Sequence, residues 1–565
     1  MSDRPEPSTH RIFVGSVGRL LHEAAGAFAA DRLALAEQIL RQVIELRPRE
    51  HAAWRLRGLN AAKGNQHEAA LRFLGRAIAL APDNPRYRAD LGVILARLGQ
   101  HELACAEFER AGTEYLAPGQ LFHYANALVA CGRLEPAIDA YRAASAQRPK
   151  DADILNNLAL ALMASGRTDE AEAGFRQALD RRPAHPDALL NLGNLYRMRG
   201  DADAAMACYR DALRERPDDF RLYGNLGLAL LDRDRAEDAV AVYEKALRHA
   251  PDQPDIRKSL GIAQLLLGNF SEGWANYEAR WQAEGMVDPG PALPRWNGEA
   301  LAGRNILLQC EQGFGDSLQF CRYVPLVADI AGTVTLEVPR SLARLMHSLE
   351  GRVQLVVRGE ALPEAACRAG LLSLPLLTGA GAGSLDDIPV QIPYLHPPAP
   401  LAQIWAARLS GGSGRRIGLA WAGNPKRQDD WMRSCPATAA ASLLEIQGID
   451  WVSLQKDLPD DAGESRRLAA RMVDPTGDFA DFADTAAAIQ TLDLVVTVDT
   501  AVAHLAGALG KPVWTMLSYA ADWRYLRQRD DCPWYPTMRL YRQPRPGDWA
   551  TVIDRIAADL RQRAP

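Results

Sequence analysis

Prolines recur at a nearly constant interval through the first half of the 565-residue chain. The steps between successive members of the series are 34, 36, 31, 34, 34 and 34 residues. Because proline cannot continue a helical hydrogen-bond ladder, each is expected to close the second helix of a helix pair. A period repeated this often predicts an array of stacked helical repeats. The series is Pro48, Pro82, Pro118, Pro149, Pro183, Pro217 and Pro251.

The residues between the prolines indicate the repeat type. "Leu-Gly" recurs at Gly193, Gly227 and Gly261, and an aromatic residue follows in "CYRDAL" and "VYEKAL". With a 34-residue period, these features are typical of the tetratricopeptide repeat. We predict an α-solenoid of seven to eight repeats over residues 18–285, stacked into a superhelix. The unequal steps flank "GTEYLAPGQ", where one helix junction is lengthened and the next shortened.

A candidate binding row lies eight residues after each proline. Four of its seven members are asparagines, whose side chains offer donors and an acceptor to the backbone of an extended peptide. The alternative is that these amides satisfy neighbouring helices within the array. The row is Leu56, Asp90, Asn126, Asn157, Asn191, Asn225 and Ser259, and the four asparagines are the predicted acceptor-peptide residues.

The bulk composition excludes several classes of function. A formal net charge of −5 gives no electrostatic footprint for nucleic acid, and no run of 18 apolar residues predicts a membrane span. Residues 1–17, polar and with two prolines, lack the apolar core of a signal peptide and are expected to be a disordered lead. The eight cysteines form no C-x-x-C pair, which favours free thiols in a reducing cytoplasm.

The sequence pattern changes after a Pro- and Gly-rich linker, residues 286–304, which Trp281 and Trp296 are expected to pin to its surroundings. Strands then alternate with helices, as in "NILLQC", "GTVTLEV", "RRIGLAWAG" and "LVVTVD". This alternation predicts parallel sheets covered on both faces. We predict two Rossmann-like α/β lobes, residues 305–400 and 401–565, with ligands at the carboxyl ends of the strands.

Two turns that follow predicted strands carry polar candidates. "EQGFGD" places Asp316 at the start of a helix, either as a catalytic carboxylate or as a helix cap. "LAWAGNPKRQDDWMRS" brings Asn424, Lys426 and Arg433 to the end of another strand. Backbone N–H groups and cations there suit a phosphate or diphosphate, and the alternative is a solvated basic loop.

The third turn follows the predicted central strand, residues 495–498. Asp499 is expected to cap an Ala- and Gly-rich helix whose N-terminus would attract a phosphate. Thr500 and His504, four residues apart, would share one face of this helix. Alone, His504 would more simply be a core histidine.

These turns resemble those of a known family. "VTVDTAVAHLAGALGKPVW" resembles the Asp-Thr-x-x-x-His element of the heptosyltransferase-like GT-B glycosyltransferases, and "GFGDSLQFCRYVP" and "GLAWAGNPKRQDDWMRS" resemble their lobe-opening segments. The tail from Asp522 to Trp549 is similar to bacterial proteins that fuse such a domain to tetratricopeptide repeats, including flagellin glycosyltransferases. The overall plan also resembles the O-GlcNAc transferases.

The resemblance implies roles for individual residues. Asp316 would be the base that deprotonates the acceptor hydroxyl, and Asp499, Thr500 and His504 would face the donor's phosphate and nucleotide. Gln455 and Lys456 would lie near the base or ribose.

The resulting prediction is an enzyme that transfers a sugar from a CMP-, UDP- or ADP-linked donor to Ser or Thr hydroxyls of a flagellin-like protein. No D-x-D element stands at a suitable strand end, so we expect no metal and no cofactor. The alternatives are a non-catalytic scaffold with a nucleotide-binding domain, and an enzyme with a glycan or lipid-linked acceptor.

Overall fold

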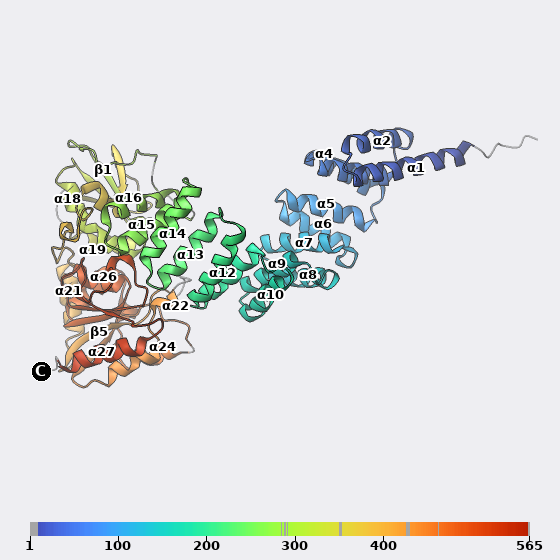
Figure 1. Cartoon of the computed structure of the whole chain (residues 1–565). Helices are drawn as coiled ribbons and strands as arrows, with labels where there is room; N and C mark the ends of the chain where they lie inside the picture. Colours follow the sequence, from blue (N-terminus) through green and yellow to red (C-terminus); the bar gives the residue numbers. More distant parts are fainter. Residues whose placement is uncertain are drawn as a thin grey trace, which may run out of the picture. The chain divides into compact units, whose positions relative to one another are not determined.

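A computed structural model describes residues 9–283, 285–286, 290, 292–349, 353–424, 430–461 and 463–562, with side chains from residue 17 onward. The chain divides into two compact units, Met1–Arg216 and Pro217–Pro565 (Figure 1). No described helix has the length and apolar character that a membrane crossing requires. All eight cysteines are free thiols.

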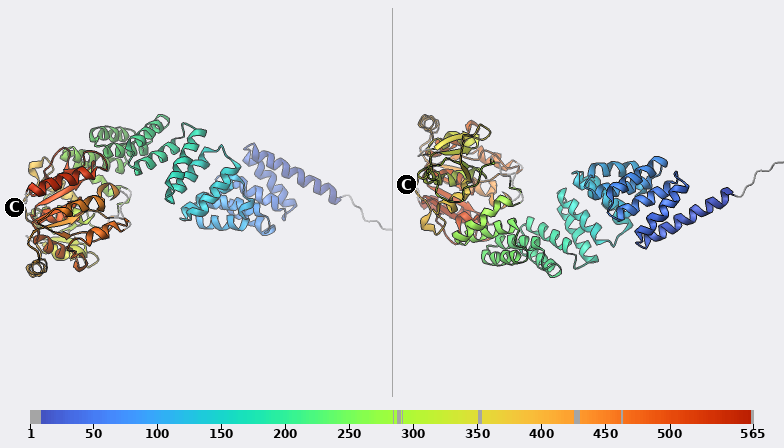
Figure 2. Two further views of the ribbon diagram at one scale, coloured as in Figure 1. Left: turned by 90° about the horizontal axis from the view of Figure 1, so that it is seen from below. Right: turned by 90° about the horizontal axis from the view of Figure 1, so that it is seen from above.

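The first unit consists of antiparallel helix pairs that stack one after another (Figure 2). Its helices are α1 (Thr9–Ala29), α2 (Leu33–Leu46), α3 (His51–Lys63), α4 (His67–Leu80), α5 (Pro85–Arg97), α6 (His101–Ala111), α7 (Pro118–Ala130), α8 (Leu134–Gln147), α9 (Ala152–Ala164), α10 (Thr168–Arg181), α11 (Pro186–Met198) and α12 (Ala202–Glu215), with a 3-10 turn η1 (Thr113–Tyr115). The α-solenoid predicted from the proline period is confirmed.

Contact between a glycine and a tyrosine explains the recurring sequence pattern. Gly193 in α11 packs against the ring of Tyr209 in α12, and a Cβ on Gly193 would lie 2.5 Å from Cε1 of that ring. Gly227 and Tyr243 repeat the arrangement one pair later. Both rings are completely buried, so the missing side chain lets the two helices of each pair approach.

Two sequence predictions are corrected here. Pro118 does not close a helix: it is the first residue of α7, a position where the missing N–H costs no hydrogen bond. Counting from the proline therefore places Asn126 three residues further along its helix than Asn157 stands in α9. The helix α1 begins at Thr9, within the predicted lead of residues 1–17, because apolar residues at helical spacing extend that far.

The second unit contains the last two repeats as well as both lobes. Its repeat helices are α13 (Phe220–Asp232), α14 (Ala236–His249), α15 (Pro254–Leu266) and α16 (Phe270–Tyr277), followed by the 3-10 turn η2 (Glu278–Gln282). Side chains of α15 and α16, including Leu265 and Trp274, share one hydrophobic core with the lobes. In the predicted linker, the Trp296 backbone N–H donates to Arg368 O at 2.8 Å, and the Trp296 side chain is buried.

The first lobe is built on a four-stranded parallel sheet of order β3-β2-β1-β4. Its elements are β1 (Ile306–Gln309), α17 (Phe314–Phe320), η3 (Cys321–Tyr323), α18 (Val324–Ala328), β2 (Val334–Val338), α19 (Arg340–Met346), β3 (Val353–Val357), β4 (Cys367–Gly370), η4 (Leu371–Ser373), α20 (Leu374–Thr378), η5 (Leu385–Asp387) and α21 (Ala399–Arg408).

The second lobe is built on a five-stranded parallel sheet of order β6-β5-β7-β8-β9. Successive residues of β7 alternate between two cores: Val495 faces α25 and α26, whereas Val496 faces α27. Both faces are thus covered, as predicted. The elements are β5 (Arg415–Ala420), α22 (Asp430–Arg433), α23 (Ala437–Ala440), η6 (Ala441–Glu445), β6 (Ile449–Ser453), α24 (Glu464–Ala469), η7 (Thr476–Asp478), α25 (Phe482–Gln490), β7 (Leu494–Val498), α26 (Ala501–Ala508), β8 (Val513–Leu517), η8 (Trp523–Tyr525), β9 (Met538–Arg542) and α27 (Trp549–Gln562).

The glycine–tyrosine contact predicts the effect of adding one methyl group. Gly193→Ala forces a Cβ into the immobile Tyr209 ring, so we expect a loss of about 2 kcal/mol in unfolding free energy. Gly75→Ala is the control, because Gly75 lies in α4 with nothing within 4 Å of its Cβ position. It should stabilise by about 0.5–1 kcal/mol through helix propensity. Thermal unfolding of both variants checks the pair, and equal shifts would contradict the packing argument.

Candidate active site at the carboxyl ends of the strands

In open α/β sheets, ligands bind beyond the carboxyl ends of the strands, where the strand order reverses. In the first sheet this point lies between β1 and β4, and the protein itself fills it. The fully buried Glu311 carboxylate accepts the backbone N–H groups of Leu371 (2.8 Å) and Leu372 (3.0 Å) and pairs with Arg280 at 3.0 Å. Burial raises the pKa of Glu311, and Arg280 opposes that rise.

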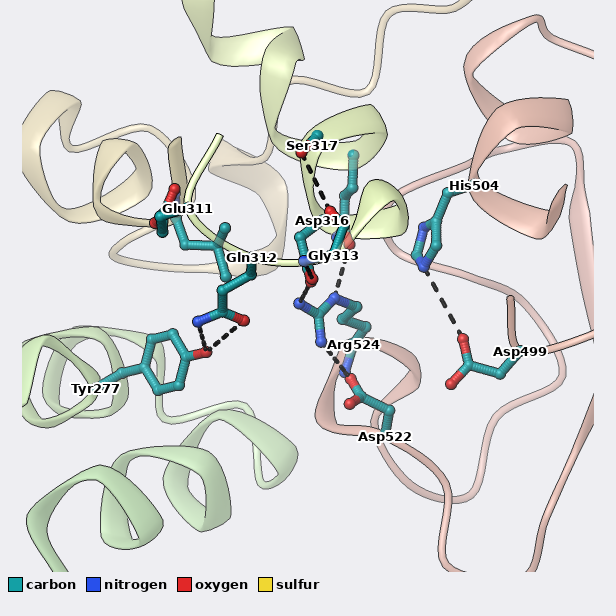
Figure 3. A network of polar contacts seen from close by, with 12 residues as sticks. Tyr277, Glu311, Gln312, Gly313, Asp316, Ser317, Asp499, His504, Asp522 and Arg524 are labelled. Atoms are coloured by element: carbon teal, nitrogen blue, oxygen red, sulfur yellow. Dashed lines mark hydrogen bonds and ion pairs between the residues drawn. The ribbon is translucent and has the colours of Figure 1, made fainter. Parts of the chain in front are cut away.

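Asp316 lies on the turn that follows this filled position. Its Oδ2 accepts the Gly313 backbone N–H at 2.9 Å, which joins the third residue of α17 to the N-cap, so the helix-capping alternative is correct. Its Oδ1 accepts a hydrogen bond from Arg524 Nη2, a residue of the second lobe (Figure 3). The Asp316 side chain is 21% exposed, so a carboxylate held at both oxygens still reaches solvent.

Arg524 lies between two carboxylates, Asp316 and Asp522 (Figure 3). Its Nη1 donates to Asp522 Oδ1 at 2.8 Å. Burial alone would lower the pKa of Arg524, but the two carboxylates outweigh it and hold that pKa above its ordinary value. Burial likewise opposes ionisation of Asp522, yet Arg524 holds the pKa of Asp522 below its usual range. All three groups therefore stay charged at neutral pH.

Asp499 ends β7 and does not cap the following helix, which corrects the sequence prediction. Its Oδ1 accepts the Tyr525 hydroxyl at 2.7 Å, and its Oδ2 lies 3.4 Å from Arg433 Nη2. Arg433 Nη2 also donates to the Asp499 backbone carbonyl. The two strand-end turns of the second lobe therefore meet at this residue, with the Arg433 side chain 26% exposed.

Thr500 is the N-cap of α26, but its side chain makes no capping hydrogen bond. The Thr500 hydroxyl lies 3.3 Å from the Thr497 hydroxyl instead. Within the described part of the chain, no side chain occupies the first N–H groups of α26, which leaves them available to an anion.

His504 is a buried packing residue. Its Nδ1 lies 3.1 Å from the Tyr535 hydroxyl and its Nε2 3.9 Å from Asp499 Oδ1. A Cβ on Gly315 would lie 2.9 Å from His504 Cδ2, so the glycine turn of the first lobe rests on this ring. Burial, reinforced by the charge of Arg524, lowers the pKa of His504 to about 3, and the ring is neutral at pH 7. A phosphate contact remains a prediction.

The other predicted donor-site residues lie around β5. Asn424 is exposed on the loop after β5, and Lys426 lies outside the described residues. Gln455 is buried: its Oε1 accepts the backbone N–H groups of Trp421 (3.1 Å) and Ala422 (2.9 Å), so it shapes the loop. Lys456 Nζ donates to a backbone carbonyl, that of residue 479, at 2.9 Å.

The asparagines of the repeats bond to one another. Asn157 Nδ2 donates to Asn126 Oδ1 at 3.3 Å, and the Tyr141 hydroxyl donates to the same oxygen. Asn156 donates to Asn157 at 3.0 Å and accepts from Asn191 at 3.0 Å. The alternative of bonds within the array is thus realised for Asn126, Asn157 and Asn191. Their binding of a peptide stays a prediction, as does that of Asn225.

Sequence reasoning missed Arg524, Asp522, Tyr525 and Tyr535. All four lie in "DWRYLRQRDDCPWY", which has no regular period and gave no strand or helix signal. Its density of Trp, Tyr, Arg and Asp was the only available indication. Among the described residues, no three His, Cys, Asp or Glu side chains gather as metal ligands would.

The low pKa of His504 predicts a pH-dependent stability. The unfolded chain takes up a proton near pH 6.5 that the folded ring refuses down to about pH 3, so stability falls as pH falls through this window, by about 1.4 kcal/mol per unit. His504→Gln lacks this loss, and the Tm gap between wild type and variant should narrow from pH 7.5 to 5.5. Exposed His347→Gln is the control. A gap that does not change with pH would contradict the prediction.

Comparisons with known proteins agree with this division of the chain. A model described as glycosyltransferase family 9 (heptosyltransferase) matches residues 479–524, which include Asp499, Thr500, His504, Asp522 and Arg524. A tetratricopeptide repeat model matches residues 23–85, 57–115, 157–220 and 225–289, and a second TPR repeat model matches residues 125–166.

Protein FlbA of Caulobacter vibrioides (strain ATCC 19089 / CIP 103742 / CB 15) is 28% identical over 326 residues, 53% of this chain and 54% of FlbA. The chain thus spans about half the length of this curated relative. The solved structure of YrrB, a TPR protein with an unusual peptide-binding site, is 20% identical over 32% of this chain and 95% of its own (TM-score 0.31). TTC0263, a thermophilic TPR protein of Thermus thermophilus, is 26% identical over 32% and 99% (TM-score 0.28). The chain joins tetratricopeptide repeats to a heptosyltransferase-like α/β region.

Proposed function

We propose that this protein is a glycosyltransferase that moves a sugar from a nucleotide-sugar donor to a Ser or Thr hydroxyl of a protein acceptor. One observation carries the proposal. The turn with Asp316 in the first lobe and the turns with Asp499 and Arg433 in the second meet at the carboxyl ends of the strands, and the family 9 match covers the second-lobe turn at Asp499. A carboxylate, a cation and a free helix N-terminus are the groups that such a transfer uses.

The reaction needs a base for the acceptor hydroxyl. Each carboxylate oxygen has a second lone pair, so Asp316 retains acceptor capacity beside its bonds to Gly313 and Arg524. The hydroxyl proton passes to Asp316 while the hydroxyl oxygen forms a bond to the anomeric carbon. The bond from that carbon to the donor phosphate breaks, and its electron pair leaves with the nucleotide.

The leaving phosphate gains negative charge, which Arg433 and the N–H groups at the start of α26 are placed to stabilise. This arrangement supports a metal-independent reaction. A CMP-, UDP- or ADP-linked sugar would bind beside β5 and β7, where the order of the second sheet reverses. The corresponding point of the first sheet is filled by Glu311, which favours the second lobe as the donor side.

The repeats supply the acceptor side of the proposal. Tetratricopeptide arrays present a long surface to a polypeptide, and binding there raises the concentration of acceptor hydroxyls near the site. A flagellin is the first acceptor to test, because the tail of the sequence resembles bacterial flagellin glycosyltransferases.

Asp316→Asn tests the base. It keeps an oxygen for the Gly313 N–H but cannot take the proton, so kcat for transfer should fall by about 10²–10⁴. Asp387→Asn is the matched control, because Asp387 makes the same N-cap bond, to the Ser384 N–H at 3.0 Å, away from the site. CMP-, UDP- and ADP-linked sugars are each assayed with EDTA present. Full activity of Asp316→Asn would remove the base assignment, and an inactive wild type would favour the scaffold alternative.

Deleting residues 1–216 tests the role of the repeats. The second unit keeps its own core, so hydrolysis of the donor should persist. Transfer to a flagellin should fall by about 10²-fold or more in kcat/KM, because binding and chemistry are no longer linked. Unchanged transfer would show that the first unit does not hold the acceptor and would favour a glycan or lipid-linked one.

A further inference from the structure

The guanidinium of Arg524 is committed to protein groups on three of its edges. Nη2 donates to Asp316, Nε to Gln319 Oε1 at 2.8 Å, and Nη1 to Asp522 Oδ1 at 2.8 Å. Its Cζ lies 4.3 Å from the ring centroid of Trp523, which covers one face. The side chain is only 9% exposed. A group bound in this way acts on its protein partners, and it does not present itself to a substrate.

Arg524 itself is held at several points. Asp522 Oδ1 accepts both the Arg524 backbone N–H (3.0 Å) and its Nη1, so one carboxylate fixes main chain and side chain together. The Arg524 backbone carbonyl accepts from the indole N–H of Trp534 at 2.8 Å. Planar guanidinium donors hold a carboxylate in one orientation better than an ammonium does.

We propose that Arg524 is the positioning residue for the catalytic carboxylate of the proposed glycosyl transfer. Asp316 and Gln319 lie three residues apart on one face of α17, and Arg524 grips both, so it sets the rotamer of Asp316 and the placement of its helix together. The inference rests on the proposed function.

The position of Arg524 in the chain gives this grip a purpose. Arg524 follows Asp316 by 208 residues and belongs to the lobe that would bind the donor. The base therefore takes its alignment from the donor lobe, although it stands on the other one. A displacement of about 1 Å at a reacting group costs about 10²-fold in rate, so this alignment bears directly on kcat.

A double-mutant cycle tests the proposal with whichever CMP-, UDP- or ADP-linked sugar the wild type uses. Arg524→Met should lower kcat by about 10- to 100-fold and leave KM for the donor within about threefold. In the Asp316→Asn background the same change should cost less than about threefold more, because Arg524 acts through Asp316. Arg524→Lys should lie between wild type and Arg524→Met.

Arg344→Met is the matched control. Arg344 in α19 also joins one lobe to two carboxylates of the other, Asp481 (2.6 Å) and Asp484 (2.6 Å), away from the site. Its loss should change Tm but leave kcat within about threefold. An equal fall in kcat for both arginine variants would mean that Arg524 only holds the lobes together, and would overturn the proposal.

Three further outcomes are decisive. Added guanidinium should restore part of the kcat of Arg524→Ala, which also serves if Arg524→Met folds poorly, and absence of rescue together with full activity of Arg524→Lys would overturn the proposal. Additive losses in the cycle, or a raised donor KM with unchanged kcat, would make Arg524 a substrate contact. If Asp316→Asn is inactive and Arg524→Met is not, this inference fails alone. If the wild type neither transfers nor hydrolyses a donor, the proposed function fails with it.

Discussion

A cluster of buried aromatic rings holds the second unit together. The ring centroids of Trp274 and Trp523 lie 5.2 Å apart, those of Trp274 and Phe320 5.9 Å, and those of Phe320 and Trp534 5.6 Å. All four side chains are at most 4% exposed. They come from the last repeat, the first lobe and the second lobe. Removing a buried tryptophan costs about 3–5 kcal/mol, so three distant segments are joined by contacts that are hard to replace.

The polar groups of the candidate site stand at the edge of this cluster. Trp523 carries the guanidinium of Arg524 on its face, and Phe320 ends the helix that begins beside Asp316. Buried charges add little to stability because their desolvation offsets their attraction, but they fix orientation. The aromatic rings thus supply the free energy that keeps the lobes together, and the ion pairs decide how Asp316 faces the second lobe.

Local patterns predicted much of this fold. The proline period and the Leu-Gly and Tyr positions gave the repeats, and β-branched runs gave β1, β2 and β7. Two strands escaped prediction: β4 is the short "CRAG", and β9 lies in an irregular segment. The register of Asn126 was wrong because a proline opens a helix as readily as it follows one. Asp316, Asp499 and Arg433 were found because each stands at a strand end.

The sequence by itself determined the repeats, the two parallel sheets and the turns that bear Asp316 and Asp499, because periodicity and turn chemistry act over a few residues. Tertiary structure alone decided which side chains meet. Arg524 reaches Asp316 across 208 residues, and Glu311 closes the crevice of the first sheet with backbone N–H groups 60 and 61 residues away. No local pattern encodes such contacts, since they depend on how separately folded elements pack.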